Sequence, residues 1–173
     1  MNWSAACIYY IIPLMNIDII CVGKVKESYY REALAEYTKR LSKYCRINII
    51  EVADEQTPEG CSDKEAALIM QKEGDRILGK IAPDAYVIAT AIEGKSLGSE
   101  QFARLIEDKA INGVSRLCFI IGGSLGLADE VKARADMLLS FSAVTFPHQL
   151  MRVILTEQVY RAFRIIKGEP YHK

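Results

Sequence analysis

The chain has 173 residues, 50% of them hydrophobic, and its 22 Lys and Arg are balanced by 22 Asp and Glu. This length suits one domain with a well-buried core and leaves too little chain for two comfortable ones. A net charge of zero argues against binding of nucleic acid by bulk electrostatics alone.

The charges are unevenly distributed along the chain. Residues 15–50 carry seven Lys and Arg against four Asp and Glu, residues 51–130 carry eight against fifteen, and residues 131–173 carry seven against three. The two ends are therefore basic and the middle is acidic. If the ends meet in space, they form a local basic patch of the kind that attracts phosphate-bearing partners. Ordinary solvated faces are an equally good interpretation.

The five cysteines are odd in number and form neither a C-x-x-C motif nor a cluster with histidine. Their pattern indicates neither a disulfide framework nor a zinc site, and it favours a reducing, cytoplasmic location. Residues 1–14 are apolar but lack the positive start and the length of a signal peptide or a membrane span. We expect them to be an extension outside the native or structured domain, which would then comprise residues 15–173.

From Met15 onward, short β-rich runs alternate with helical periods, which is typical of an α/β domain with a mostly parallel sheet and helices on both faces. A first helix is indicated by Tyr30, Leu34, Tyr37, Leu41 and Tyr44, whose spacing of three and four makes a core-facing stripe. The predicted strands are residues 17–22, 47–52, 85–91, 117–121 and 137–141. The other predicted helices are residues 62–81 with a capping box at its start, a helix capped by Ser99, a short helix from about 128, and a last helix from about 147 to 168.

Three successive strands of this prediction end in unusual loops, residues 90–94, 122–126 and 141–146. Ligands of open parallel sheets bind outside the carboxyl ends of the strands, so we expect these loops to line one crevice. The loop in FIIGGSLGLADE lacks the first glycine of a dinucleotide fingerprint, and no Gly-Lys-Ser/Thr makes it a phosphate-binding loop. A glycine-rich turn without any ligand is the alternative interpretation.

Around the last helix, several residues are candidates for chemistry. Thr145 is a possible N-cap, and His148 falls in the first helical turn, where the helix dipole favours a neutral imidazole that can accept a proton. Arg152 lies one turn further on and is a candidate for contact with a substrate phosphate. The ending PYHK brings Tyr171 and His172 as groups able to stack and to exchange protons, although a terminal tail is usually frayed.

The segments IIGGSLGL, LSFSAVTFPHQLMRVILTEQVYRAFRI and PYHK closely resemble the RlmH family of SPOUT methyltransferases, over residues 15–173. The resemblance implies an α/β fold with a C-terminal trefoil knot, a homodimer, and S-adenosylmethionine as cofactor, with no metal and no membrane partner. It implies methylation of N3 of a pseudouridine in helix 69 of 23S ribosomal RNA, on assembled ribosomes. Two rivals are a ribosome- or RNA-binding module without methyl transfer and a SPOUT methyltransferase with another target.

Carried over by position, the family's cofactor contacts fall on one residue after the third strand, one glycine and a run of six residues. These are Thr90, Gly122, Phe141, Ser142, Ala143, Val144, Thr145 and Phe146. Position 90 is a departure, because the family usually has leucine there, which weakens an expected apolar contact with adenine. The resemblance leaves His148, Tyr171 and His172 as candidates for removing the N3 proton, with Arg152 as a positioning group. Tail residues of a second subunit are expected to complete the site.

Overall fold

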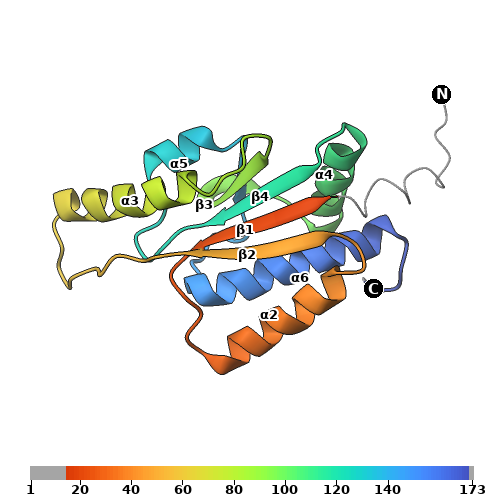
Figure 1. The fold of residues 1–173 in the computed structure, drawn as a ribbon, viewed down its shortest axis with the longest axis horizontal. Coiled ribbons are helices and arrows are strands. Elements are labelled where there is room, and N and C mark those ends of the chain that lie inside the picture. The colour runs from red at the N-terminus through yellow and green to blue at the C-terminus, as the bar shows by residue number, and fades with distance from the viewer. Residues whose placement is uncertain (1–14, 172–173) are drawn as a thin grey trace.

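The computed structural model describes residues 15–171, so the expectations for residues 1–14, His172 and Lys173 lie outside the described part. Five parallel strands form a single sheet in the order β2-β1-β4-β3-β5 (Figure 1). The strands are β1 (Asn16–Val22), β2 (Arg46–Val52), β3 (Tyr86–Ser96), β4 (Arg116–Ile121) and β5 (Met137–Ser140). The helices are α2 (Ser28–Leu41), α3 (Asp63–Leu78), α4 (Ser99–Ile111), α5 (Asp129–Arg134) and α6 (His148–Ile166).

The predicted α/β class with helices on both faces is confirmed. Alternate residues of each buried strand face opposite sides of the sheet. Ile19 of β1 packs into the cluster under α2, α4 and α6, whereas Ile20 packs into the cluster under α3 and α5. Figure 1 shows α2 and α6 on one side of the sheet and α3 and α5 on the other. The trefoil knot does not follow from the strand order and stays a prediction.

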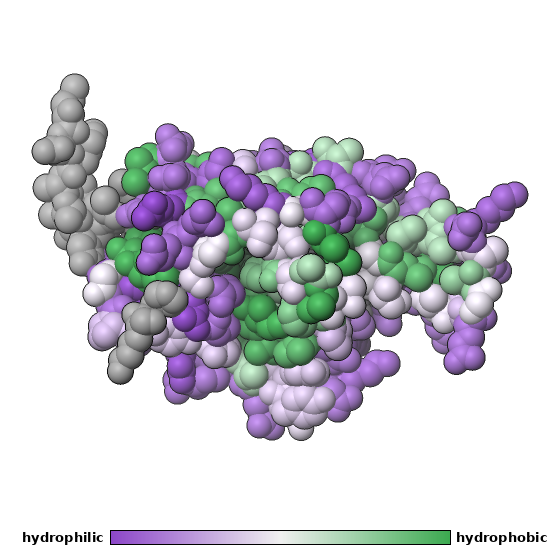
Figure 2. Space-filling view, turned by 180° about the vertical axis from the view of Figure 1, so that it is seen from behind, coloured by the Kyte–Doolittle hydropathy of each residue, from purple (hydrophilic) through white to green (hydrophobic). Residues whose placement is uncertain are grey.

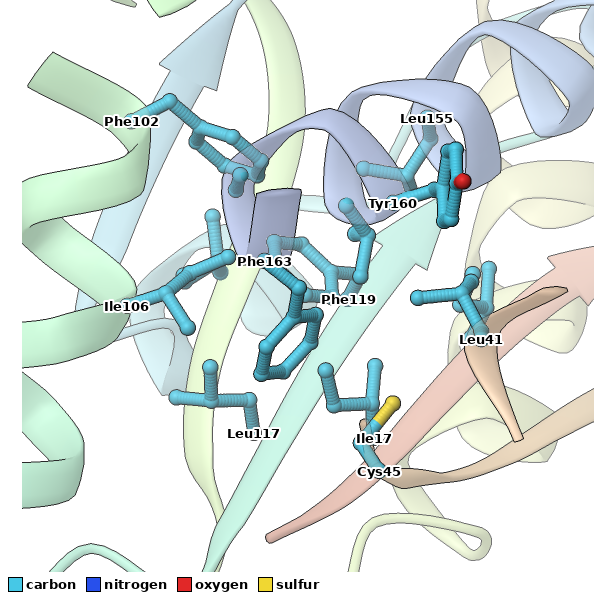
Figure 3. Packing of buried hydrophobic residues seen from close by; sticks show 14 of the residues in the cluster. Ile17, Leu41, Cys45, Phe102, Ile106, Leu117, Phe119, Leu155, Tyr160 and Phe163 are labelled. Atoms are coloured by element: carbon cyan, nitrogen blue, oxygen red, sulfur yellow. The ribbon is translucent and has the colours of Figure 1, made fainter. Parts of the chain in front are cut away.

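The larger core lies between the sheet and α6. Phe119 of β4, Phe102 of α4 and Phe163 of α6 are almost completely buried in it (Figure 3). The rings of Phe102 and Phe119 have centroids 5.9 Å apart. Each such aromatic ring removes a large apolar area from water, about 1.5–3 kcal/mol per side chain. The tyrosines of the predicted stripe also pack here, because Tyr37 and Tyr44 belong to this core or contact it.

Most predicted element boundaries agree with the structure to within a few residues. The capping box of α3 is present, since Ser62 Oγ accepts from the Glu65 amide at 3.4 Å and the Glu65 carboxylate accepts from the Ser62 amide at 2.8 Å. The helix α3 ends at Leu78 rather than near residue 81. The prediction that Ser99 caps α4 is wrong, because Gly98 is the N-cap. The amide of Gly98 donates a hydrogen bond to Gln101 Oε1 at 3.0 Å.

The largest correction concerns β3. We expected a loop at residues 90–94, but the strand continues to Ser96 and pairs with β5 on both sides of a register shift between Thr90 and Lys95. Gly94 makes this possible, because a Cβ there would lie 2.7 Å from the backbone of Leu138 and Leu139. The extra residues form a bulge, which leaves Ile92 and Glu93 exposed beside the sheet edge.

No helix within residues 15–171 combines the length and the apolarity needed to span a lipid bilayer.

Candidate active site

A cavity of about 870 Å³ lies at the bulge of β3 and the carboxyl ends of β4 and β5. All three predicted segments contribute to its wall, which confirms that they meet in space. Seven of the eight residues carried over as cofactor contacts line it, namely Thr90, Gly122, Phe141, Ser142, Val144, Thr145 and Phe146. Ala143 is exposed and is not among the lining residues. The size is within the range of pockets that enclose a drug-sized or nucleoside ligand.

The glycine-rich loop between β4 and α5 folds back on itself. A Cβ at Gly122 would lie 2.6 Å from the carbonyl oxygen of Gly126, and Gly126 has φ +94°, a conformation that other residues rarely adopt. The amide of Gly126 donates to the carbonyl of Gly123 at 3.2 Å. The tight turn expected from the sequence is therefore confirmed. The close approach to Gly126 requires a glycine at position 122, so a larger residue there would change the loop as well as the cavity.

A buried carboxylate supports this loop from below. Glu73 of α3 is 5% exposed, and a Cβ at Gly123 would lie 2.6 Å from its Oε2. Its Oε1 accepts a hydrogen bond from the Glu55 amide at 3.0 Å. Burial is the main cause that raises the pKa of Glu73 above its ordinary value, and the charge of Asp54 adds to it. The hydrogen bond from the Glu55 amide acts in the opposite direction. The sequence analysis did not identify Glu73, because it occupies a helical position that a solvated glutamate would fill equally well.

The segment after β5 is held by short-range hydrogen bonds of its serines. Ser140 Oγ donates to the Ser142 carbonyl at 3.2 Å, and Ser142 Oγ accepts from the Val144 amide at 3.1 Å. These bonds fix the backbone while Val144 and Phe146 remain 64% and 37% exposed. Thr145 lies outside α6, whose N-cap is Pro147, so the possible capping role of Thr145 is not realised. The segment presents apolar side chains and backbone groups to the cavity.

The side chain of Thr90 forms a hydrogen bond within the sheet. Its hydroxyl donates to the carbonyl of Ile120 on β4 at 2.9 Å. This bond joins β3 to β4 near the point where their pairing ends. A threonine at this position therefore satisfies its polar group within the protein.

His148 opens α6 and lines the cavity. Burial lowers the pKa of its imidazole below the ordinary value of 6.5, the nearby Arg152 guanidinium lowers it further, and Asp54 opposes the shift. The imidazole is consequently neutral at pH 7 and able to accept a proton, as expected from its helical position.

Arg152 does not occupy the place expected for a phosphate ligand. Its side chain is completely buried, donating to the carboxylate of Glu51 at 3.0 Å and to the carbonyls of Val22 and Gly23 at 2.5 and 2.9 Å. The expected contact between Arg152 and a substrate phosphate is therefore not supported, because the guanidinium is not accessible to a ligand. The residue joins α6 to the carboxyl ends of β1 and β2, next to His148.

The tail residue Tyr171 lies away from the cavity of its own chain. Its hydroxyl donates to Glu157 Oε1 at 3.0 Å, and its ring contacts that of Tyr160 at a centroid distance of 5.1 Å. Twelve residues of α6 separate Tyr160 from His148, which corresponds to about 18 Å of helix. Burial and the bond to Glu157 raise the pKa of Tyr171, which keeps its phenol protonated. His172 lies outside the described residues.

The lining of the cavity fits S-adenosylmethionine. Apolar side chains such as Leu139, Phe141 and Met151 suit a nucleoside base, and the glycine loop brings backbone groups to the wall. Two carboxylates and one ammonium, those of Glu93, Asp129 and Lys132, are the charged groups among the lining residues. Within residues 15–171, no group of three His, Cys, Asp or Glu is arranged to hold a metal ion. The charged wall formed by Glu93 and Lys132 was not recognised in the sequence, since the bulge that exposes Glu93 depends on pairing with β5.

A parallel sheet with a cavity of this kind at its carboxyl edge is a common architecture for nucleoside-derived cofactors. A family model described as a predicted SPOUT methyltransferase matches residues 15–172, and the chain belongs to this family. One solved structure, a probable methylase family protein from Haemophilus influenzae Rd KW20, superposes with a TM-score of 0.52 at 14% identity. The superposition covers 92% of this chain and 71% of that one, and at this identity it supports the fold alone.

Within that family, the chain is similar to proteins named ribosomal RNA large subunit methyltransferase H. The relative from Bacillus pumilus (strain SAFR-032) is 61% identical over 159 residues, and that from Clostridioides difficile (strain 630) is 60% identical over the same length. In both cases the alignment covers 92% of this chain and the whole of the relative. This similarity places the chain in the RlmH family, as the resemblance of its C-terminal segments implied.

Proposed function

We propose that the protein transfers a methyl group from S-adenosylmethionine to N3 of a pseudouridine in helix 69 of 23S ribosomal RNA. The observation that carries this proposal is the meeting of the β3 bulge, the glycine loop after β4 and the segment after β5 around one cavity, in a chain of the RlmH family. Bound S-adenosylmethionine would supply an electrophilic methyl group, so the protein has mainly to bind and orient both partners. Residues of the segment 141–146 and of the glycine loop would hold the cofactor.

His148 is the group that we assign to the proton of N3. It lines the cavity and is neutral at pH 7, whereas Tyr171 of the same chain lies well away and keeps its proton. As N3 forms its bond to the methyl carbon, the bond from that carbon to the sulfonium sulfur would break, S-adenosylhomocysteine would leave, and the N3 proton would pass to the His148 imidazole. Arg152 would act indirectly, by fixing the first turn of α6 against β1 and β2.

A homodimer is part of this proposal. Apolar side chains remain exposed at the cavity, with Ile92, Val144 and Phe146 at 57%, 64% and 37%. Figure 2 shows apolar residues gathered over the middle of the rear face, with hydrophilic residues around them. A second copy covering such a surface would remove it from water. It would also bring the tail of the second subunit to the cavity, which Tyr171 of the same chain does not line.

The substrate and the location follow from the same proposal. The net charge of zero leaves shape and neighbouring surfaces to select the RNA, which suits a substrate presented by an assembled ribosome. Ribosomes are cytoplasmic in bacteria, so the enzyme would act in the cytoplasm.

The direct test is mass spectrometry of 23S ribosomal RNA from a strain that lacks the gene. We expect N3-methylpseudouridine to disappear and to return when the wild-type chain is expressed. Persistence of the modification in the deletion strain would contradict the proposed substrate. Calorimetry with S-adenosylmethionine separates the rivals, since a binding module without methyl transfer would not bind the cofactor even with ribosomes present.

A further inference from the structure

An ion pair spans the wall of the cavity between the bulge of β3 and α5. Lys132 Nζ lies 2.6 Å from Glu93 Oε1, and both residues line the cavity. The two side chains are 31% and 55% exposed, so solvent and ligands can reach both charges. The ammonium holds the pKa of Glu93 below its ordinary value, which keeps the carboxylate ionised at neutral pH.

The position of this pair is defined by the fold. Glu93 is exposed beside the sheet because β3 is bulged between Thr90 and Lys95, and Lys132 is fixed by the short helix that follows the glycine loop. The segment after β5, which also lines the cavity, contributes apolar and small polar residues. The lining from the β3 bulge and α5 thus carries charge of both signs, and the lining from residues 141–146 carries none.

The proposed cofactor has the same division. One end is a nucleoside without charge, and the other is an amino acid with one ammonium and one carboxylate. We propose that the amino-acid end of S-adenosylmethionine binds between Glu93 and Lys132, with its ammonium on Glu93 and its carboxylate on Lys132. This inference rests on the proposed function and assigns a subsite within it.

Glu93 and Lys132 can exchange their mutual contact for contacts with the ammonium and carboxylate of the cofactor, which keeps every charge paired. A partly exposed ion pair contributes little to stability, so the Glu93–Lys132 contact opens at low cost. In its place form two charge-assisted contacts, one for each charged group of the amino acid. Asp129 lines the same cavity but has no ion pair with Lys132 among the contacts of the described residues, and it is the natural comparison for Glu93.

Two ligands isolate the amino-acid end. S-adenosylhomocysteine and 5′-methylthioadenosine are both uncharged at sulfur and share the nucleoside, but the second lacks the amino acid. By calorimetry, we expect Lys132→Met and Glu93→Gln each to weaken binding of S-adenosylhomocysteine about tenfold and to leave binding of 5′-methylthioadenosine unchanged. Lys132→Arg, which keeps the charge, should bind both ligands nearly as the wild type does.

Matched controls remove like charges elsewhere. Lys64→Met removes an exposed ammonium from α3, and Asp129→Asn removes a carboxylate from the same cavity. Both should keep wild-type affinity for S-adenosylhomocysteine. The inference is overturned if Lys132→Met and Glu93→Gln keep wild-type affinity, if they weaken both ligands equally, or if Asp129→Asn has the effect expected of Glu93→Gln.

Decarboxylated S-adenosylmethionine, which keeps the ammonium, assigns the two contacts separately. Its affinity should be insensitive to Lys132→Met and remain sensitive to Glu93→Gln, and the reverse would contradict the assignment. Failure of the proposed function looks different from all of these outcomes. If the chain were a binding module without methyl transfer, the wild type itself would bind none of the three nucleosides, with or without ribosomes. If it methylated another target, N3-methylpseudouridine would persist in the deletion strain while these affinities stayed as expected.

Discussion

The carboxyl ends of β1 and β2 lie at the same edge of the sheet as the bulge of β3 and the carboxyl ends of β4 and β5, yet the cavity is lined by the second group and not by the first. The first group is closed by Arg152, which fills the space and bonds the carbonyls of Val22 and Gly23. At the second group, glycines and a bulge leave backbone and small side chains around a space. A parallel sheet provides the edge, and the neighbouring side chains decide where it is open.

The first two turns of α6 contribute a side chain to each region. His148 and Arg152 are one helical turn apart, a spacing that puts two side chains on the same face of a helix. The imidazole lies at the rim of the cavity, whereas the guanidinium is buried beneath it and bonds to Glu51. One turn of helix therefore joins a reactive position to a structural one, and substitutions there should separate the two regions experimentally.

The largest effect is expected for His148→Gln on the open side. A positioned general base contributes about 10²- to 10⁴-fold, so methyl transfer to ribosomes should fall at least about a hundredfold. The rate is measured under single-turnover conditions with saturating cofactor. Binding of S-adenosylhomocysteine by calorimetry is the control and should be retained. A variant that keeps the wild-type rate would exclude His148 as the base.

Arg152→Met should have the largest effect on stability, on the closed side. Removing the guanidinium leaves two backbone carbonyls and the Glu51 carboxylate without their partner, and loss of one member of a buried pair costs about 3–5 kcal/mol. We expect about 3 kcal/mol in the free energy of unfolding by urea, because Glu51 is itself 35% exposed. Arg40→Met breaks the exposed pair with Glu36 and is the matched control, with a much smaller loss expected. Equal losses would show that the closed region is not held by Arg152.

Gly122→Ala tests the glycine loop of the open side. The added carbon would lie 2.6 Å from the Gly126 carbonyl oxygen, so the loop must shift, at a cost of about 1–3 kcal/mol. Gly79→Ala is the control, since Gly79 has a helical backbone with φ −67°, and a Cβ there meets only the carbonyl oxygens of Asp75 and Arg76 at 3.4 and 3.8 Å. We expect urea unfolding and calorimetry to show lower stability and weaker cofactor binding for Gly122→Ala alone. Unchanged behaviour would mean that the loop is loosely packed.

The smallest effect concerns pH. Because the folded chain lowers the pKa of His148, protonation favours the unfolded chain. The contribution of His148 to the free energy of unfolding is fully present above about pH 6.5, the pKa in the unfolded chain. It decreases as the pH falls from that value to the lower pKa of the folded chain. Urea unfolding over this range should show a steeper decrease for the wild type than for His148→Gln. Parallel curves would contradict the shift.

Much of the fold could be predicted because its signals are local. The period of the stripe from Tyr30 to Tyr44 predicts a core-facing helix, and Ser62 with Glu65 predicts the start of α3. The cavity followed from a general property of parallel sheets applied to three loops. The extent of β3 could not be predicted, because Glu93 and Gly94 read as a turn, and only pairing with β5 makes them part of a bulged strand.

The sequence by itself determined the class of fold, the order of its elements and the family, since hydrophobic period, caps and the C-terminal segments are readable without contacts. Only the tertiary structure decided that Arg152 closes one part of the sheet edge, that Glu73 lies under the glycine loop, and that Glu93 meets Lys132 in the lining of the cavity. The reason is physical. The environment of a charged side chain depends on which distant backbone groups surround it, and no local pattern specifies those.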